Sequence, residues 1–259
     1  MTTHPAYGEL RQVTPSAAVL LEENPSAMTL EGTNTWLLRA PGAEACVIVD
    51  PGYEDVPHLA RVVAAAGEVA LILVTHQHPD HVQGAPWLAA RVDAPVRAFD
   101  PTLCVGAPAL TDDELVEAAG LSIQVLHTPG HTEDSICLAT NGTVLTGDSM
   151  LGRGTTVISN LGAYLDSLRR LAAVPAGTLA LPGHGPELPD VAETAREYLT
   201  HREARLNQVR EALSELGRDA TARQIVEHVY RDVDESLWGP AEWSVHAQLD
   251  YLRTTGEAR

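Results

Sequence analysis

The amino-acid sequence predicts an α/β domain followed by a small helical domain. Four short apolar runs before residue 185 have the length of buried strands, and each run leads into a turn that carries His or Asp. A long segment that begins at Glu193 instead places its leucines at helical spacing. With 259 residues, the chain is long enough for one large core and a small appendage. We therefore predict domains over residues 1–194 and 195–259.

The first apolar run, Leu71–Val74, leads into a histidine-rich segment over residues 75–81. Alternate residues of an extended chain point to one side, so His76, His78 and Asp80 can converge on a common site. His81 follows after the chain turns, and it can reach a second ion. The alternative is a polar surface loop that happens to be rich in histidine. The further candidate ligands elsewhere in the chain argue against that alternative.

The other three apolar runs each lead to one further candidate ligand. The runs cover residues 122–126, 143–146 and 178–181. The residues that follow them are His131, Asp148 and His184. A single histidine after a strand is usually structural or merely exposed, but the repetition of the pattern favours a site. Rigid strand ends behind short loops suit a preorganised metal centre.

The number and type of the candidates predict a centre with two ions. They comprise five imidazoles and two carboxylates. One tetrahedral zinc takes four ligands, or three and a water at a catalytic site, so seven are too many for a single ion. Imidazole and carboxylate without thiolate favour Zn²⁺, two per chain, with Mn²⁺ or Fe as alternatives.

The carboxyl-terminal part of the chain predicts three helices. Residues 193–216 form one long amphipathic pattern, and Gly217 follows as a stop. Thr221 and Gln224 have the spacing of a capping box, which opens a second helix. Residues 241–252 predict a third, with an apolar face.

Four pieces of the sequence, taken as a set, resemble the metallo-β-lactamase superfamily. They are residues 75–81, Thr128–His131, Thr146–Asp148 and Pro182–His184. The resemblance implies a four-layer αββα sandwich. It also implies one metal held by His76, His78 and His131, and a second held by Asp80, His81 and His184.

The same resemblance implies roles for two further carboxylates. Asp148 would bridge the two metals, together with a water or hydroxide. Asp50 matches a position that orients the metal-binding loop. The alternative for Asp50 is a plain residue of the turn that follows a strand.

Departures from particular members narrow the resemblance. Zinc β-lactamases lack the bridging carboxylate, so the presence of Asp148 argues against antibiotic hydrolysis. Flavodiiron proteins carry Glu where this chain has His78, and the long RNA-gripping arm of tRNA 3′-processing endonucleases has no room here. What remains resembles glyoxalase II and the beta-lactamase-like-protein-2 branch. Residues 32–38 and 151–156 support the latter, which implies a winged-helix-like domain over residues 195–259.

These features predict a dinuclear zinc hydrolase that uses a metal-bridging hydroxide to cleave a small ester or thioester. Asp80 and Asp148 are the predicted catalytic carboxylates, acting as metal ligands rather than as free general bases. The branch that the chain resembles includes mammalian endoribonucleases and fungal thioesterases. Cleavage of single-stranded RNA is therefore the alternative activity. A non-catalytic binding module is the third possibility, and the complete set of seven ligands argues against it.

The composition bears on partners and location. A net charge of −18 disfavours RNA and favours a small-molecule acyl substrate, because nucleic-acid binding relies on cations that neutralise phosphates. No apolar run reaches the length of a membrane span, and the first 25 residues lack the apolar block of a signal peptide. Cys46, Cys104 and Cys137 lie in separate segments, which predicts a reducing, cytoplasmic setting. The sequence indicates no particular oligomeric state.

Five residues are candidates for substrate binding. Arg153 follows a ligand-bearing strand and suits an anionic group of the substrate. Tyr198, His201 and Arg202 belong to the most basic stretch of the long helix, which we expect near the metal cleft. Their alternative is an ordinary solvated helix face. Asn34 could hydrogen-bond substrate, and its alternative is a turn residue.

Overall fold

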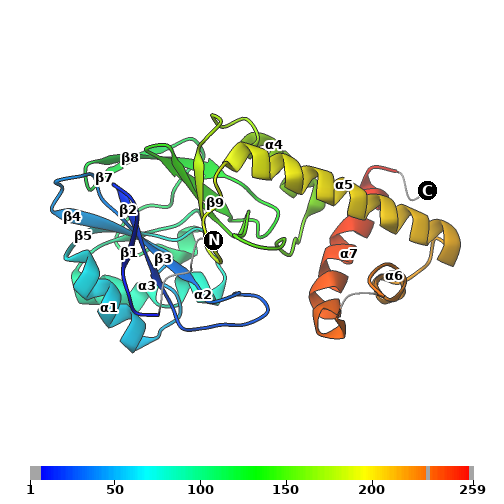
Figure 1. Cartoon of the computed structure of the whole chain (residues 1–259), viewed down its shortest axis with the longest axis horizontal. Helices are drawn as coiled ribbons and strands as arrows, with labels where there is room; N and C mark the ends of the chain where they lie inside the picture. Colours follow the sequence, from blue (N-terminus) through cyan, green and yellow to red (C-terminus); the bar gives the residue numbers. More distant parts are fainter. Residues whose placement is uncertain (1–6, 232–233, 257–259) are drawn as a thin grey trace.

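The computed structural model describes residues 7–231 and 234–256. Two β-sheets face each other, with helices on both outer sides, and a helical tail extends from one side (Figure 1). This arrangement confirms the αββα sandwich that the motifs imply. No helix within the described ranges combines the length and the apolarity that a membrane span requires.

The first sheet has six strands in the order β1-β2-β3-β4-β5-β6. Its strands are β1 (Arg11–Thr14), β2 (Ala17–Leu21), β3 (Asn34–Leu38), β4 (Ala45–Val49), β5 (Glu68–Leu73) and β6 (Val96–Arg97). Alternation along β4 sends Val47 and Val49 into the core between the sheets. Cys46 and Ile48 point the other way, into the core beneath helices α1 (Val56–Ala66) and α3 (Ala85–Val92).

The second sheet has five strands in the order β11-β10-β9-β8-β7. Its strands are β7 (Leu115–Ala118), β8 (Leu121–His127), β9 (Ile136–Thr140), β10 (Thr143–Gly147) and β11 (Leu179–Pro182). A 3₁₀ turn, η1 (Pro101–Leu103), lies between the two sheets in the chain. Helix α4 (Leu161–Leu171) packs on the outer face of this sheet, where Leu161, Tyr164 and Leu168 are buried.

The four apolar runs that predict strands all form strands, namely β5, β8, β10 and β11, with ends that differ by a few residues from the expected ones. Strands β4 and β5 are parallel, and so are β10 and β11. Parallel neighbours bring their carboxyl ends to the same edge of a sheet. The ligand-bearing turns therefore gather at one end of the sandwich.

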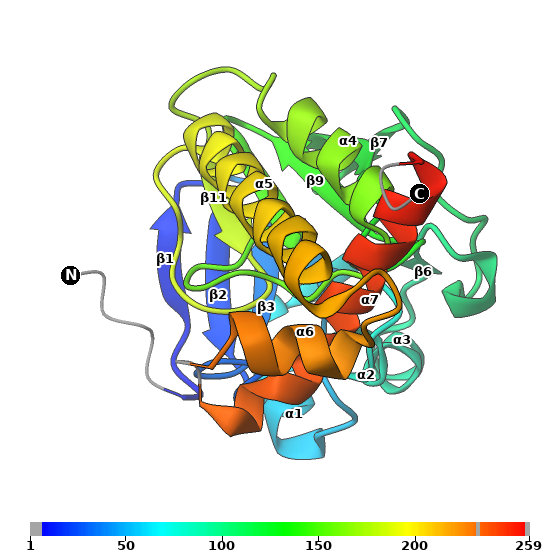
Figure 2. The same ribbon diagram turned by 90° about the vertical axis from the view of Figure 1, so that its right-hand side faces the viewer.

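The tail consists of α5 (Val191–Leu216), α6 (Ala222–Val229), a 3₁₀ turn η2 (Glu235–Leu237) and α7 (Trp238–Thr254). The capping box at Thr221 is present, because its side chain accepts from the backbone of Gln224 and the side chain of Gln224 accepts in return. Figure 2 shows α6 and α7 gathered beside α5. Side chains of α4, α5, α6 and α7 share one core with the second sheet. Helix α5 runs without interruption through the boundary predicted at residue 194.

Candidate metal centre

Seven histidine and aspartate side chains meet at the carboxyl ends of the strands and form two groups. The first group is His76, His78, His131 and Asp148, and the second is Asp80, His81 and His184. In the first group, Nδ1 of His78 lies 3.0 Å from Nε2 of His76 and 2.9 Å from Nε2 of His131. In the second, Nε2 of His184 lies 3.2 Å from Oδ2 of Asp80 and 3.3 Å from Nε2 of His81.

Asp148 lies between the two groups. One carboxylate oxygen, Oδ2, is 3.7 Å from Nε2 of His131 and 3.4 Å from Nε2 of His184. The other, Oδ1, is 3.6 Å from Nε2 of His81, and it is buried without a hydrogen-bond partner among the described residues. A buried carboxylate in this position, with one oxygen unsatisfied, suits a bridging ligand.

The donor atoms fit divalent ions in number, type and spacing. Ligands bound to one tetrahedral zinc at about 2.0–2.1 Å lie roughly 3.3 Å from one another, and the distances within each group are close to that value. Imidazole and carboxylate are ligands for zinc, manganese or iron. The two groups therefore fit two neighbouring ions that share Asp148.

Hydrogen bonds fix the orientation of the imidazole rings. Nδ1 of His131 donates to the carbonyl oxygen of Val157 at 2.7 Å, and Nδ1 of His184 donates to that of Gly32 at 3.1 Å. Each bond assigns the proton to Nδ1 and leaves Nε2 facing the centre. These carbonyl partners carry no sequence signal, because any residue type supplies a backbone oxygen.

Asp50 contacts the histidine-rich segment at two points. Its carboxylate accepts from the backbone N–H of Thr75 at 2.8 Å and from the hydroxyl of Thr75 at 2.7 Å. Oδ2 of Asp50 also accepts from Nδ1 of His81 at 2.9 Å. The backbone of Asp50 has a φ of 53°, a conformation that Asp adopts more readily than most residues. Asp50 thus lies where it can hold both the start of the segment and one ligand ring.

Burial and charge give the two groups different protonation. Burial, followed by the neighbouring His131, lowers the pKa of His78 to about 4, and burial lowers the pKa of His76 well below its usual value. Burial also opposes a charge on His184, but the carboxylates of Asp148 and Asp80 raise its pKa to about 9. His76 and His78 are therefore neutral, which is the form that binds metal. In the second group, the raised pKa values of His81 and His184 mean that both rings carry an extra proton, which a bound divalent ion would displace.

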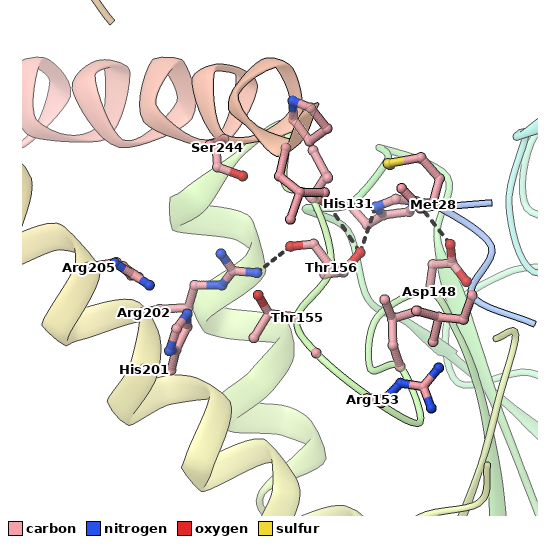
Figure 3. A pocket seen from close by; sticks show the side chains of 18 of the residues that line it. Met28, His131, Asp148, Arg153, Thr155, Thr156, His201, Arg202, Arg205 and Ser244 are labelled. Carbon is pink, nitrogen blue, oxygen red and sulfur yellow. Dashed lines mark hydrogen bonds and ion pairs between the residues drawn. The ribbon is translucent and has the colours of Figure 1, made fainter. Parts of the chain in front are cut away.

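A pocket of about 350 Å³ opens from the metal centre toward the tail. His131 and Asp148 lie at its inner end, and α5 and α7 form much of the opposite wall (Figure 3). Tyr230, directly after α6, also lines the pocket. Apolar side chains, including Met28, Leu151 and Leu237, line much of the space between. The stretch of α5 that we expected near the metal cleft does lie there.

Of the five predicted substrate-binding residues, some line the pocket and others are buried behind it. His201 lines the pocket, and Arg153 lies at its rim with 60% of its side chain exposed, paired with Glu31. Asn34 is not a turn residue: it is buried in β3 and donates to the carbonyl oxygens of Pro182 and Gly185. The side chain of Asn34 therefore holds the loop of His184, and burial keeps it from the pocket.

Tyr198 and Arg202 are buried rather than solvated, so the alternative of an ordinary solvated helix face is wrong for them. The hydroxyl of Tyr198 donates to the carbonyl oxygen of Gly154 at 2.7 Å. The guanidinium of Arg202, which is 4% exposed, donates to the carbonyl oxygen of Thr156 and lies 5.3 Å from the centre of the Tyr164 ring. Both side chains thus hold the loop over residues 151–157.

That loop connects the tail to a metal ligand. Thr156 accepts from Arg202 through its carbonyl, and its hydroxyl lies 3.0 Å from Nδ1 of His131, as Figure 3 shows. Sequence reasoning missed Thr156 and Val157, and it also missed Met28 and Ser244 in the pocket wall. Their side chains are of common types, and only the folded chain brings them to the site.

Replacing Arg202 by methionine should destabilise the protein by about 1–3 kcal/mol, because the buried carbonyl of Thr156 loses its donor. It should also weaken zinc binding, because the loop that holds His131 loosens. Urea unfolding and zinc titration measure the two effects. Arg196→Met is the control, because Arg196 lies on the same helix and donates to the carbonyl oxygen of Ala172 at 3.2 Å, but from an exposed position; it should cost about 0.5 kcal/mol or less and leave zinc affinity unchanged. Equal stability and equal zinc affinity in both variants would contradict the role of Arg202.

Comparison with known proteins identifies two regions of the chain. The profile of the metallo-beta-lactamase superfamily matches residues 28–184, and that of the beta-lactamase associated winged helix domain matches residues 221–259. The chain is 33% identical to a Beta-lactamase-like protein 2 homolog of Drosophila melanogaster, with 96% of this chain and 91% of the relative covered. It is 32% identical to an atrochrysone carboxyl ACP thioesterase of Aspergillus chevalieri, with 90% and 79% covered.

A solved structure agrees with these matches. The crystal structure of a beta-lactamase domain protein from Burkholderia ambifaria superposes with a TM-score of 0.84 at 25% identity. The superposition covers 99% of this chain and 91% of the other. The fold, the family profiles and the relatives confirm the resemblance that the sequence motifs indicate. The chain belongs to the metallo-beta-lactamase superfamily, a family of metal-dependent hydrolases, and carries the associated winged-helix domain at its carboxyl end.

Proposed function

We propose that the protein is a dinuclear zinc hydrolase that cleaves a small ester or thioester. The observation that carries the proposal is the opening of the metal centre, through His131 and Asp148, into a pocket of about 350 Å³. That volume lies at the lower end of the range of about 300–1,000 Å³ for small-molecule sites. The likeness to a protein named a thioesterase supports acyl chemistry, and the three free cysteines support a cytoplasmic setting.

Two zinc ions, when bound, would lower the pKa of a water held between them and supply hydroxide near neutral pH. The chain's own residues provide the geometry of the reaction. Asp148 sets the relative position of the two ligand groups, since its oxygens face both. Asp50 and the carbonyl of Val157 hold the rings of His81 and His131. The apolar pocket wall excludes water from the acyl group and orients it toward the centre.

The alternative activity, cleavage of single-stranded RNA, meets an electrostatic obstacle. The net charge of −18 repels a polyanion at long range. Phosphate contacts make RNA affinity fall steeply with salt, by roughly a thousandfold or more between 50 and 200 mM when many phosphates are bound. A small thioester has few such contacts, so salt distinguishes the two activities.

We expect zinc-loaded protein to hydrolyse generic acyl thioesters, with a kcat/KM that changes less than about twofold across that salt range. Cleavage of single-stranded RNA should be weak at every salt concentration. Asp148→Ala protein, assayed in parallel, sets the background for both reactions. Efficient RNA cleavage that collapses with salt and vanishes in Asp148→Ala, without thioester turnover, would establish the nuclease instead.

A further inference from the structure

We propose that the end of the pocket nearest the tail binds a carboxylate of the substrate through Arg205, so that the preferred acyl group is an apolar chain with an anionic end. This inference rests on the proposed hydrolase function and deepens it by assigning a substrate class. Arg205 lies in the pocket wall on α5, at the opposite end from the ligands His131 and Asp148.

The described residues hold the guanidinium of Arg205 in place, but none of them provides a carboxylate to pair with it. Its guanidinium lies 4.7 Å from the centre of the Tyr230 ring, and Nη1 donates to Oε1 of Gln208 at 2.9 Å. Within residues 7–231 and 234–256, no carboxylate pairs with it. A guanidinium held by a ring face and a neutral amide keeps its charge and has donors left over for a planar oxyanion.

A second guanidinium, that of Arg202, adds positive charge at the same end of the pocket. His201 and Arg202 rise from α5 beside Arg205, and Ser244 lies opposite on α7 (Figure 3). Burial, then the charges of Arg202 and Arg205, lower the pKa of His201, so its imidazole contributes a neutral polar group rather than a third cation. Arg153 differs, because it lies at the exposed rim and already pairs with Glu31. Arg205 is therefore the better anchor for an anion inside the pocket.

The lining between the two ends favours a carboxylate on an apolar chain. Met28, Leu151, Leu237 and Ala241 contribute apolar side chains to the lining of the same pocket. Such a wall offers little solvation, so a single negative charge costs less to bury there than a doubly charged phosphate. The substrate would thus place its reacting carbonyl at the metal centre and its second carboxylate at Arg205.

Matched pairs of N-acetylcysteamine thioesters test the assignment. Each pair has equal chain length and differs only at the far end, which is methyl or carboxylate: butanoyl and succinyl, hexanoyl and adipoyl, octanoyl and suberoyl. Wild-type protein should prefer the carboxylate member of the best-fitting pair by about tenfold or more in kcat/KM, as charge-assisted hydrogen bonds are worth about that factor. Arg205→Gln should abolish the preference through KM and leave the methyl member nearly unchanged.

Arg196→Gln removes the same charge from an exposed position of α5 and should retain the preference. Two results would overturn the inference. One is a wild-type protein that prefers no carboxylate thioester over its methyl partner, and the other is an Arg205→Gln protein whose kcat/KM falls equally for both thioesters of a pair. If no thioester is hydrolysed, the hydrolase proposal fails, and calorimetry on zinc-loaded protein then tests the anion site alone. Adipate should bind more tightly than hexanoate to wild type and equally to Arg205→Gln. Equal binding of the two acids to wild type would refute the site.

Discussion

Replacing Asp148 by alanine should lower hydrolysis by roughly a thousandfold or more, because metal stabilisation is worth several kcal/mol and each 1.4 kcal/mol is a factor of ten. The carboxylate faces both ligand groups, so its loss affects both ions at once. Elemental analysis should find close to two zinc ions per wild-type chain and one or none in the variant. Turnover of a thioester measures the activity.

Two observations would contradict this expectation. Fewer than one ion per wild-type chain after zinc loading would exclude a dinuclear centre. An Asp148→Ala protein that keeps two ions and full turnover would remove the bridging role of Asp148. Asp148→Asn is the matched variant, since it preserves the shape of the side chain and removes its charge. Circular dichroism and urea unfolding show whether each variant is folded.

Gly183→Ala should weaken metal binding although position 183 is not itself a ligand. A Cβ atom there would lie 2.6 Å from Oδ1 of Asp148 and 2.7 Å from Cε1 of His81. The backbone of Gly183 is not in the left-handed region, so alanine is excluded by contact rather than by conformation. We expect a loss of about 10–100-fold in zinc affinity, comparable to the loss of a residue that orients a ligand. Turnover should fall with it.

Gly239→Ala is the control for the glycine change. Position 239 lies in α7, and an added Cβ there meets no atom within 4 Å. This variant should bind zinc and turn over substrate like wild type. Zinc titration followed by a thioester assay compares the two proteins. If Gly183→Ala binds zinc as tightly as Gly239→Ala does, then Asp148 and His81 can move aside without cost, and the centre is less rigid than the contacts indicate.

Much of the fold was predictable because its signals are local. The length of an apolar run and the turn that follows it depend on a few neighbouring residues, as for β5 and the histidine-rich segment after it. A capping box is likewise a relation between residues three apart, and the one at Thr221 formed as expected. The same local signals could not assign Asn34, Tyr198 or Arg202. Their partners are backbone carbonyls far away in the chain, and a carbonyl has no signature in the sequence.

The amino-acid sequence alone predicted the ligand-bearing strands and the candidate ligands, because apolar run length and ligand type are properties of the residues themselves. The motifs added the αββα sandwich through the family resemblance. The folded chain gives the distances that place Asp148 between the two groups, as the resemblance implies. It alone shows that Arg202 reaches His131 through Thr156. The folded chain alone also shows that α5 and α7 line a pocket beside the centre, with Arg205 at the far end. These features arise from the packing of the tail against α4 and the second sheet, where residues distant in sequence bury a common core. Such contacts depend on shape and burial across the whole chain, which local patterns do not record.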